Sequence, residues 1–293
     1  MAQTGITDLI AAIGAGALLA GGVYGLLLLT RRLLRLLPAG PSLRLPTGPV
    51  PNTWPLILEQ QVPLTGELSE PERARLLRLV QMFLHEVPIE GCSGLQVTEE
   101  MQVTIAATAC LLIVNFPYPR FTALRRVLIY PDTFVPVHLP SRHTRGVETE
   151  PEPTLGEAWR DGIVVLSWSS VRRGDADASG GRNVVLHEFA HVLDGEDGAF
   201  DGSPILESPS SVRDWRQVFE AAFGLEHDAV RESTEPPLEP YAATNRAEFF
   251  AVATEVFFEA PVRLRQRLPE LYEQLRLFYR QDPAARSRSP SAP

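Results

Sequence analysis

The sequence contains no lysine, and this absence excludes several kinds of chemistry. All 27 basic residues among its 293 residues are arginines. Schiff-base catalysis and phosphate binding by a P-loop both need a lysine amine, so neither is available to this chain. The net charge of −9 also argues against direct nucleic-acid binding, because counterion release requires a basic surface.

Cysteine is almost as scarce, with only Cys92 and Cys110 in the chain. Two cysteines cannot build a disulfide framework or a four-thiolate zinc site. Cys92 lies in a Gly/Ser turn and Cys110 in an apolar run. We expect two reduced, buried thiols in a cytosolic domain.

Charged residues are missing from residues 9–30, LIAAIGAGALLAGGVYGLLLLT. About 20 apolar residues are enough to cross the roughly 30 Å hydrocarbon core of a bilayer. Arg31, Arg32 and Arg35 follow this run directly, whereas only Asp8 precedes it, so the positive-inside rule places the rest of the chain in the cytoplasm. The sequence thus predicts one N-terminal transmembrane helix and a single-pass membrane protein; the alternative is a cytoplasmic protein.

The rest of the chain divides by composition into three parts. Residues 37–55 are rich in Pro, Gly and Ser and predict a linker. Residues 283–293, which include RSRSPSAP, predict a disordered tail. Residues 56–282 between them are expected to form one folded domain.

Within this domain, helical patterns outnumber strand patterns. Ser69-Glu70-Pro71-Glu72 has the form of a capping box before an amphipathic helix, and Thr98 opens a second helix that is apolar all round. Residues 126–130 and 162–168 predict strands. Further helices are predicted at 183–193, near Ser211, near Thr244 and from Pro261. Strands cluster before 183–193 and helices dominate after it, which predicts an α+β fold, helix-rich with a small sheet.

The segment His187-Glu188-Phe189-Ala190-His191 carries the strongest chemical signal. Residues i and i+4 of a helix share a face, so His187 and His191 can bind one metal ion. Glu188 can reach a water molecule on that ion, which is the position of a general base. The alternative is two histidines that face solvent or the core. The apolar surroundings argue against it, because a buried glutamate between two histidines needs partners.

A catalytic zinc ion needs a third protein ligand. His227, the only histidine after the motif, lies in a polar stretch. Glu248 is the better candidate, because it falls in the first turn of a helix rich in phenylalanine, where an unpaired carboxylate is costly. Glu255 lies seven residues later on about the same face, and is either a rival ligand or the acceptor of a ligand histidine's N–H.

Three further features have two interpretations each. Tyr241 either donates to a developing oxyanion or packs on the surface as a loop tyrosine. Asp194 either orients a ligand imidazole or terminates the helix. The strand at 162–168 is either an exposed edge that pairs with an extended substrate peptide or a buried central strand.

The segments HEFAHVLDGEDG and YAATNRAEFFAVATEVFF closely resemble the Mlc titration factor A family of zinc-dependent peptidases. Other stretches are also similar to that family: EGCSGLQVTEEMQVTIAATACLL, RVLIYPDTFV, GEAWRDGIVVLSW and LFYRQDPAAR. The resemblance covers about residues 55–285. It implies a zincin-like metallopeptidase domain with a gluzincin-type site for one zinc ion.

The resemblance also implies a role for each candidate residue. His187, His191 and Glu248 would be the zinc ligands, Glu188 the general base and Tyr241 the catalytic tyrosine. The implied substrate is a peptide or protein, with aminopeptidase-like activity on small substrates. One branch of the family binds a glucose-responsive transcriptional repressor. A regulator-binding protein with a secondary metal site is therefore the alternative function.

Overall fold

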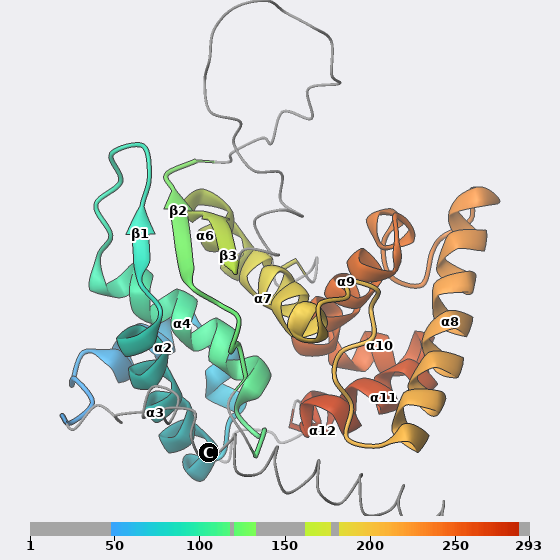
Figure 1. Ribbon diagram of the computed structural model, residues 1–293, viewed down its shortest axis with the longest axis horizontal. Helices are drawn as coiled ribbons and strands as arrows, with labels where there is room; N and C mark the ends of the chain where they lie inside the picture. The colour runs from blue at the N-terminus through green and yellow to red at the C-terminus, as the bar shows by residue number, and fades with distance from the viewer. Residues whose placement is uncertain (1–47, 118–119, 133–161, 177–181, 287–293) are drawn as a thin grey trace, which may run out of the picture. The chain divides into compact units, whose positions relative to one another are not determined.

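The computed structural model describes residues 48–117, 120–132, 162–176 and 182–286, with its elements labelled in Figure 1. The helices before the candidate metal-binding motif are α2 (Trp54–Gln61), α3 (Glu70–Glu86), α4 (Glu99–Ile113), α6 (Trp168–Ala176) and the 3-10 helix η1 (Pro63–Glu67), 3-10 helices being labelled η. The strands are β1 (Ile89–Gly91), β2 (Arg126–Tyr130) and β3 (Ile163–Ser167). From the motif onward follow α7 (Val184–Asp194), η2 (Gly195–Asp197), α8 (Pro209–Arg231), η3 (Pro240–Ala243), α9 (Arg246–Glu259), α10 (Pro261–Arg267), α11 (Pro269–Tyr279) and α12 (Pro283–Arg286).

The three strands form one parallel sheet in the order β1-β2-β3. Ile89 of β1 lies opposite Val127 of β2, and Arg126 of β2 lies opposite Ile163 of β3. Within the described residues, β3 pairs with β2 alone and so lies at an edge of the sheet. Of the two interpretations of this strand, the edge strand is therefore the one that the described sheet supports.

Helix α4 forms the centre of the core on the sheet side of the domain. Its N-cap Thr98 accepts a hydrogen bond from the backbone N–H of Met101, and its side chains are buried on almost every face. The helix packs against α2, α3 and α7. The sequence pattern, apolar on all sides, predicted this burial. Of the two free cysteines, Cys110 in α4 is buried, whereas Cys92 is partly exposed.

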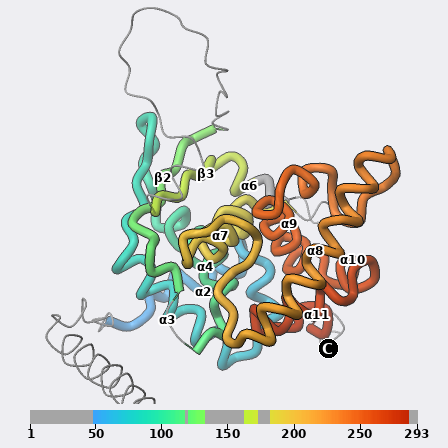
Figure 2. Tube along the Cα trace, turned by 45° about the vertical axis from the view of Figure 1, so that its right-hand side comes forward, coloured from blue at the N-terminus to red at the C-terminus, as the bar shows by residue number. Residues whose placement is uncertain are grey.

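Helix α7 lies between α4 and α9, as Figures 1 and 2 show. It contacts α4 and β3 on one side and α9 on the other. Helix α9 is also buried almost throughout, with Phe249, Phe250 and Phe257 fully enclosed. The two helices that carry the candidate metal ligands are therefore both interior helices in direct contact.

The predicted α+β class, helix-rich with a small sheet, is confirmed. The capping box at Ser69 begins α3, with both of its reciprocal hydrogen bonds present. The helix predicted from Pro261 is instead two helices, because Leu268 leaves the helical region and Pro269 begins α11. Helix α12 occupies the first residues of the predicted tail, while the domain boundaries stay predictions.

The structure overturns the predicted location as a single-pass membrane protein. In the part of the chain that the structure describes, no helix is both long and apolar enough to cross a membrane. Helix α8 is the longest at 23 residues but carries charged side chains along its length. Helix α4 is apolar but has 15 residues, fewer than the roughly 20 that a span requires. The predicted transmembrane segment itself, residues 9–30, lies outside the described residues.

Candidate metal centre

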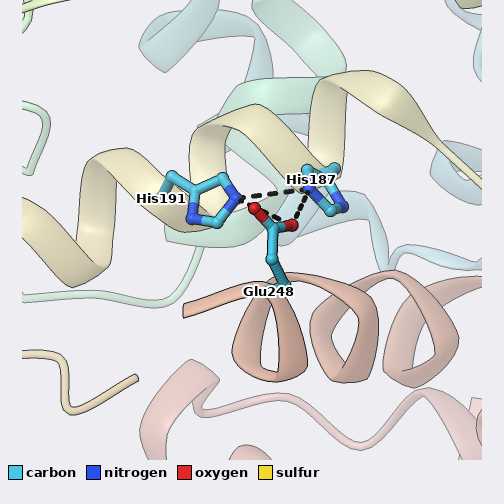
Figure 3. A group of neighbouring side chains, drawn as sticks. All are labelled: His187, His191 and Glu248. Atoms are coloured by element: carbon cyan, nitrogen blue, oxygen red, sulfur yellow. Dashed lines mark hydrogen bonds and ion pairs between the residues drawn. The ribbon is translucent and has the colours of Figure 1, made fainter. Parts of the chain in front are cut away.

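The segment from His187 to His191 occupies a helix whose first turn is fixed by Asn183. The Asn183 side chain accepts a hydrogen bond from the backbone N–H of Leu186 at 3.2 Å, which caps the N-terminus of α7. The helix then presents His187 and His191 on one face, one turn apart (Figure 3). Their rings contact each other edge to face, with centroids 4.9 Å apart.

Glu248 faces these two histidines from the neighbouring helix (Figure 3). Asn245 caps α9 by accepting a hydrogen bond from the backbone N–H of Glu248 at 3.0 Å, so the carboxylate stands in the first turn. Glu248 Oε2 lies 3.0 Å from His187 Nε2 and 3.6 Å from His191 Nε2, and the two Nε2 atoms are 3.2 Å apart. Two imidazole nitrogens and one carboxylate oxygen thus converge on one point, a donor set that fits a single metal ion.

Glu255 contacts the opposite nitrogen of the same imidazole. Its Oε1 atom lies 2.7 Å from His187 Nδ1. Its Oε2 atom accepts a hydrogen bond from the backbone N–H of Asn183. Because Glu255 binds Nδ1, it favours the tautomer in which Nε2 of His187 is free to bind a metal. Of the two roles considered for Glu255, this geometry supports the acceptor rather than the ligand.

The charges in the cluster stabilise one another when no metal is bound. Burial alone would lower the pKa of His187, but its hydrogen bonds to Glu248 and Glu255 outweigh burial and raise that pKa to about 10. Burial alone would raise the pKa of Glu248, but hydrogen bonds from His187 and His191 hold it well below its usual range. The carboxylate is therefore ionised and His187 carries a proton that a metal ion would displace.

Glu188 and Tyr241 lie beside this cluster. The Glu188 side chain is buried, with 8% of its surface exposed, and its charge raises the pKa values of both His187 and Tyr241. The Tyr241 ring centroid lies 6.2 Å from that of His187. Burial, the charge of Glu248 and a hydrogen bond to Glu248 hold the pKa of Tyr241 above its usual range. The phenol is therefore neutral and can act as a hydrogen-bond donor.

Two other residues singled out in the sequence, His227 and Asp194, have contacts outside the cluster of His187, His191 and Glu248. His227 is exposed on α8, where its nearest charged partner is Asp228. Asp194, at the end of α7, accepts a hydrogen bond from the backbone N–H of Gly202 at 2.9 Å, and burial raises its pKa to about 7. This contact fixes the turn after the motif, which supports helix termination rather than imidazole orientation as the role of Asp194.

Gly202, in the turn that follows α7, lies against residues of α8 and α9. Its φ is +77°, and a Cβ atom there would lie 2.4 Å from the ring of Phe219 and 2.7 Å from the carbonyl oxygen of Arg246. Its own carbonyl accepts a hydrogen bond from the indole of Trp215 at 3.0 Å. The absence of a side chain thus lets the end of α7 approach α8 and the start of α9.

Sequence reasoning missed the part that Asn183 plays in the site. Besides capping α7, Asn183 donates from Nδ2 to Glu259 Oε1 at 2.8 Å and from its backbone to Glu255. It therefore joins the start of α7 to two glutamates of α9. An asparagine directly before an apolar helix is a recognisable capping signal, but its link to α9 is a tertiary contact that no local pattern shows.

Comparison with known proteins agrees with this geometry. The sequence matches the family described as "Glucose-regulated metallo-peptidase M90" over residues 41–280. It is 35% identical over 239 residues to an uncharacterized protein of Synechocystis sp., covering 80% of this chain and 86% of that protein.

Two further relatives carry the name "Mlc titration factor A". The protein of Klebsiella pneumoniae is 33% identical over 231 residues, which cover 78% of this chain and 86% of the relative. The protein of Salmonella gallinarum is 32% identical over 243 residues, which cover 82% and 90%. The resemblance found in the sequence is thereby confirmed. The chain belongs to the glucose-regulated metallo-peptidase M90 family.

Proposed function

We propose that the protein is a zinc-dependent peptidase that hydrolyses peptide bonds with Glu188 as the general base. The observation that carries this proposal is the spacing of 3.0, 3.2 and 3.6 Å among His187 Nε2, His191 Nε2 and Glu248 Oε2. Ligand atoms about 2.0–2.1 Å from a tetrahedral zinc ion lie about 3.3 Å from one another. The three donors therefore suit zinc, and three protein ligands are the number typical of catalytic rather than structural zinc.

The residues around the donors have distinct parts in this reaction. A bound zinc ion would lower the pKa of the attacking water and polarise the scissile carbonyl. Glu188 takes the proton of that water and then passes it to the leaving amine. Tyr241 donates its phenolic hydrogen to the developing oxyanion. Glu255 keeps His187 in the tautomer that binds through Nε2.

The substrate is proposed to be a peptide bound in an extended conformation along β3. This strand has a free edge within the described sheet and precedes α7, with which it is in contact. Backbone hydrogen bonds to such an edge give affinity that does not depend on the sequence of the peptide. We further propose aminopeptidase-like activity on small peptides, consistent with the resemblance of the motif segments.

The test compares the full-length wild type with Glu188→Gln in zinc content and in hydrolysis of amino-acid and peptide amides. We expect both proteins to hold one zinc ion, and only the wild type to turn over substrate. Glu232→Gln, an exposed glutamate at the end of α8, is the matched control and should behave as the wild type. A wild type without zinc, or equal activity in Glu188→Gln, would refute the peptidase proposal.

The aminopeptidase part of the proposal has its own test. The same peptide amides are offered with a free and with an acetylated N-terminus. Aminopeptidase-like activity requires that acetylation abolish turnover. Equal hydrolysis of both substrates would leave a zinc peptidase but refute this preference.

A second candidate function is the binding of a transcriptional regulator such as Mlc, which the name "Mlc titration factor A" of two relatives makes worth testing. In that case the metal site is secondary. Binding of purified Mlc is measured for the wild type and for Glu188→Gln. A regulator-binding protein would bind Mlc equally well in both forms, and absence of binding by the wild type would refute this candidate.

A further inference from the structure

We propose that Glu226, a buried glutamate on α8, is a positioning residue that holds Tyr241 at the metal centre. The inference rests on the part proposed above for Tyr241 as the donor to the oxyanion. Glu226 lies fifteen residues before Tyr241 and outside the motif, and its contacts are with the backbone of the segment that leads to Tyr241.

Tyr241 cannot be held in place by burial of its own side chain. About half of that side chain is exposed, at 51%. The residue lies in η3, a single turn of four residues, and residues 232–239 before it form no helix or strand. The direction of the phenol is therefore set by the position of the backbone of η3 together with the hydrogen bond to Glu248.

Glu226 holds the backbone that leads into η3 through a hydrogen bond. Its side chain is fully buried, and Oε2 accepts a hydrogen bond from the backbone N–H of Leu238 at 2.9 Å. Burial raises the pKa of Glu226, and its interactions with the backbone N–H groups of Leu238 and Glu239 oppose that rise. The carbonyl of Glu239 in turn accepts from the N–H of Ala242, which closes the turn around Tyr241. A short series of hydrogen bonds thus connects the buried carboxylate to the residues on both sides of Tyr241.

The other polar contacts of this segment are more exposed. Arg267 pairs with Glu235 and donates to the carbonyl of Pro236 at 3.1 Å, and Arg182 pairs with Glu239 at 3.0 Å. Exposed ion pairs contribute little because solvent screens them. A hydrogen bond that is buried away from solvent is not screened in this way, so Glu226 is the main polar anchor of the segment.

The burial of Glu226 has a cost that an apolar residue would avoid. Among the described residues, its Oε1 atom has no hydrogen-bond partner. Burying a carboxylate with an unsatisfied oxygen is unfavourable, and an apolar side chain would pack there without that cost. What an apolar side chain could not supply is the acceptor for the N–H group of Leu238. The position of the Tyr241 segment is therefore the property that distinguishes glutamate from an apolar residue here.

The test uses the full-length zinc-loaded protein with Glu226→Met, which keeps the length of the side chain but lacks the acceptor. Glu226→Gln, which keeps an acceptor, is the conservative variant. Asp228→Ala, an exposed change on the same helix, is the control. Zinc content, kcat and KM are measured, together with amide hydrogen exchange in peptides covering residues 236–244. Each substitution is also made in a Tyr241→Phe background.

For Glu226→Met we expect exchange in residues 236–244 to become about 10–100-fold faster, because a buried backbone N–H loses its acceptor. We expect kcat to fall by about 10–100-fold through misplacement of the phenol, with zinc content retained and KM within about twofold of the wild type. Glu226→Gln should retain most of the wild-type kcat. In the Tyr241→Phe background, Glu226→Met should lower kcat by less than about twofold further, because the two changes remove one function.

Three results would overturn the inference. One is unchanged exchange in Glu226→Met, and another is faster exchange with an unchanged kcat. The third is an equal loss of kcat in the wild-type and Tyr241→Phe backgrounds, which indicates a general structural effect. If Glu226→Met does not fold, Glu226→Ala, which also lacks the acceptor, decides by the same measurements. An inactive wild type would refute the peptidase proposal, whereas the exchange data would still decide whether Glu226 holds this backbone.

Discussion

The proposed metal ligands and Tyr241 are held in the fold by different means. His187, His191 and Glu248 project from α7 and α9, two interior helices that pack directly against each other. Tyr241 projects from the single turn η3, and half of its side chain is exposed. The ligands are therefore placed by the core of the protein. The tyrosine is placed by a short turn that packs against α8 and α9 and by the hydrogen bonds of that turn, so the two parts of the site can be perturbed separately.

Removing a ligand from the helix pair should have the largest effect. We expect Glu248→Ala to lose stoichiometric zinc. Its activity should fall by more than the about 10–100-fold that is typical when a residue hydrogen-bonded to a metal ligand is removed. The measurement is zinc per protein by elemental analysis together with peptide hydrolysis. Glu270→Ala, an exposed glutamate on α11, is the control. Full zinc retention in Glu248→Ala would mean that another residue is the third ligand.

Removing the phenol should affect catalysis alone. We expect Tyr241→Phe to lower kcat by about 10²–10³-fold, the typical cost of removing one oxyanion donor. Zinc content and thermal stability should match the wild type, because the exposed ring contributes little to the core. Loss of zinc together with activity would contradict the separation between the two parts of the site.

The pH dependence of metal binding tests the helix pair in its metal-free form. His187 has a pKa of about 10 there, raised from its usual 6.5, so it must release a proton to bind a metal. Raising the pH removes this competition, and the affinity should rise about tenfold per pH unit between pH 7 and 9. Calorimetric titration in buffers of different ionisation enthalpy measures the proton released. Tyr241→Phe should show the same slope, and a flat profile would contradict the protonated state of His187.

Substitution of Glu255 tests the hydrogen bond between its carboxylate and Nδ1 of His187. We expect Glu255→Ala to weaken zinc binding by about 10–100-fold without abolishing it, because the ring of His187 loses its orienting partner. Glu255→Gln, which can still accept from Nδ1, should lie between this variant and the wild type. Competition with a chelator measures the affinity. Complete loss of zinc in Glu255→Ala would make Glu255 a ligand instead.

The smallest effect is expected for stability at the start of α7. Asn183→Ala should lower the free energy of unfolding by about 1–2 kcal/mol, because it removes the helix cap and the hydrogen bond to Glu259. Denaturant unfolding of the metal-free protein measures this. Asn245→Ala removes a cap of the same kind from α9 and should cost less, since the structure shows no second side-chain bond for Asn245 among the described residues. Equal losses would contradict the link between Asn183 and α9.

Features encoded by local pattern could be predicted from the sequence. The capping residues Ser69 and Thr98 each marked the start of a helix, and the β-branched runs marked β2 and β3. The spacing of His187 and His191 was enough to place them on one helical face. These signals concern neighbouring residues in the chain, so no knowledge of the tertiary fold was needed.

Features set by contacts between distant segments could not be predicted in this way. Strand β1 has only three residues and is defined by its pairing with β2. Glu248 and Glu255 both suited the third ligand, and only the packing of α9 on α7 directs one to Nε2 and the other to Nδ1 of His187. Pro269 is a local signal for the break between α10 and α11, but the helical pattern from Pro261 onward predicted one continuous helix.

The two contacts of the His187 ring come from one helix. Glu248 and Glu255 belong to α9, so any rotation of that helix about its axis moves both carboxylates together relative to the imidazole. In the metal-free protein, nitrogen chemical shifts of this single ring would therefore report the orientation of α9. Substitutions far along α9 would become visible at the metal centre through that ring, even where they touch none of its ligands.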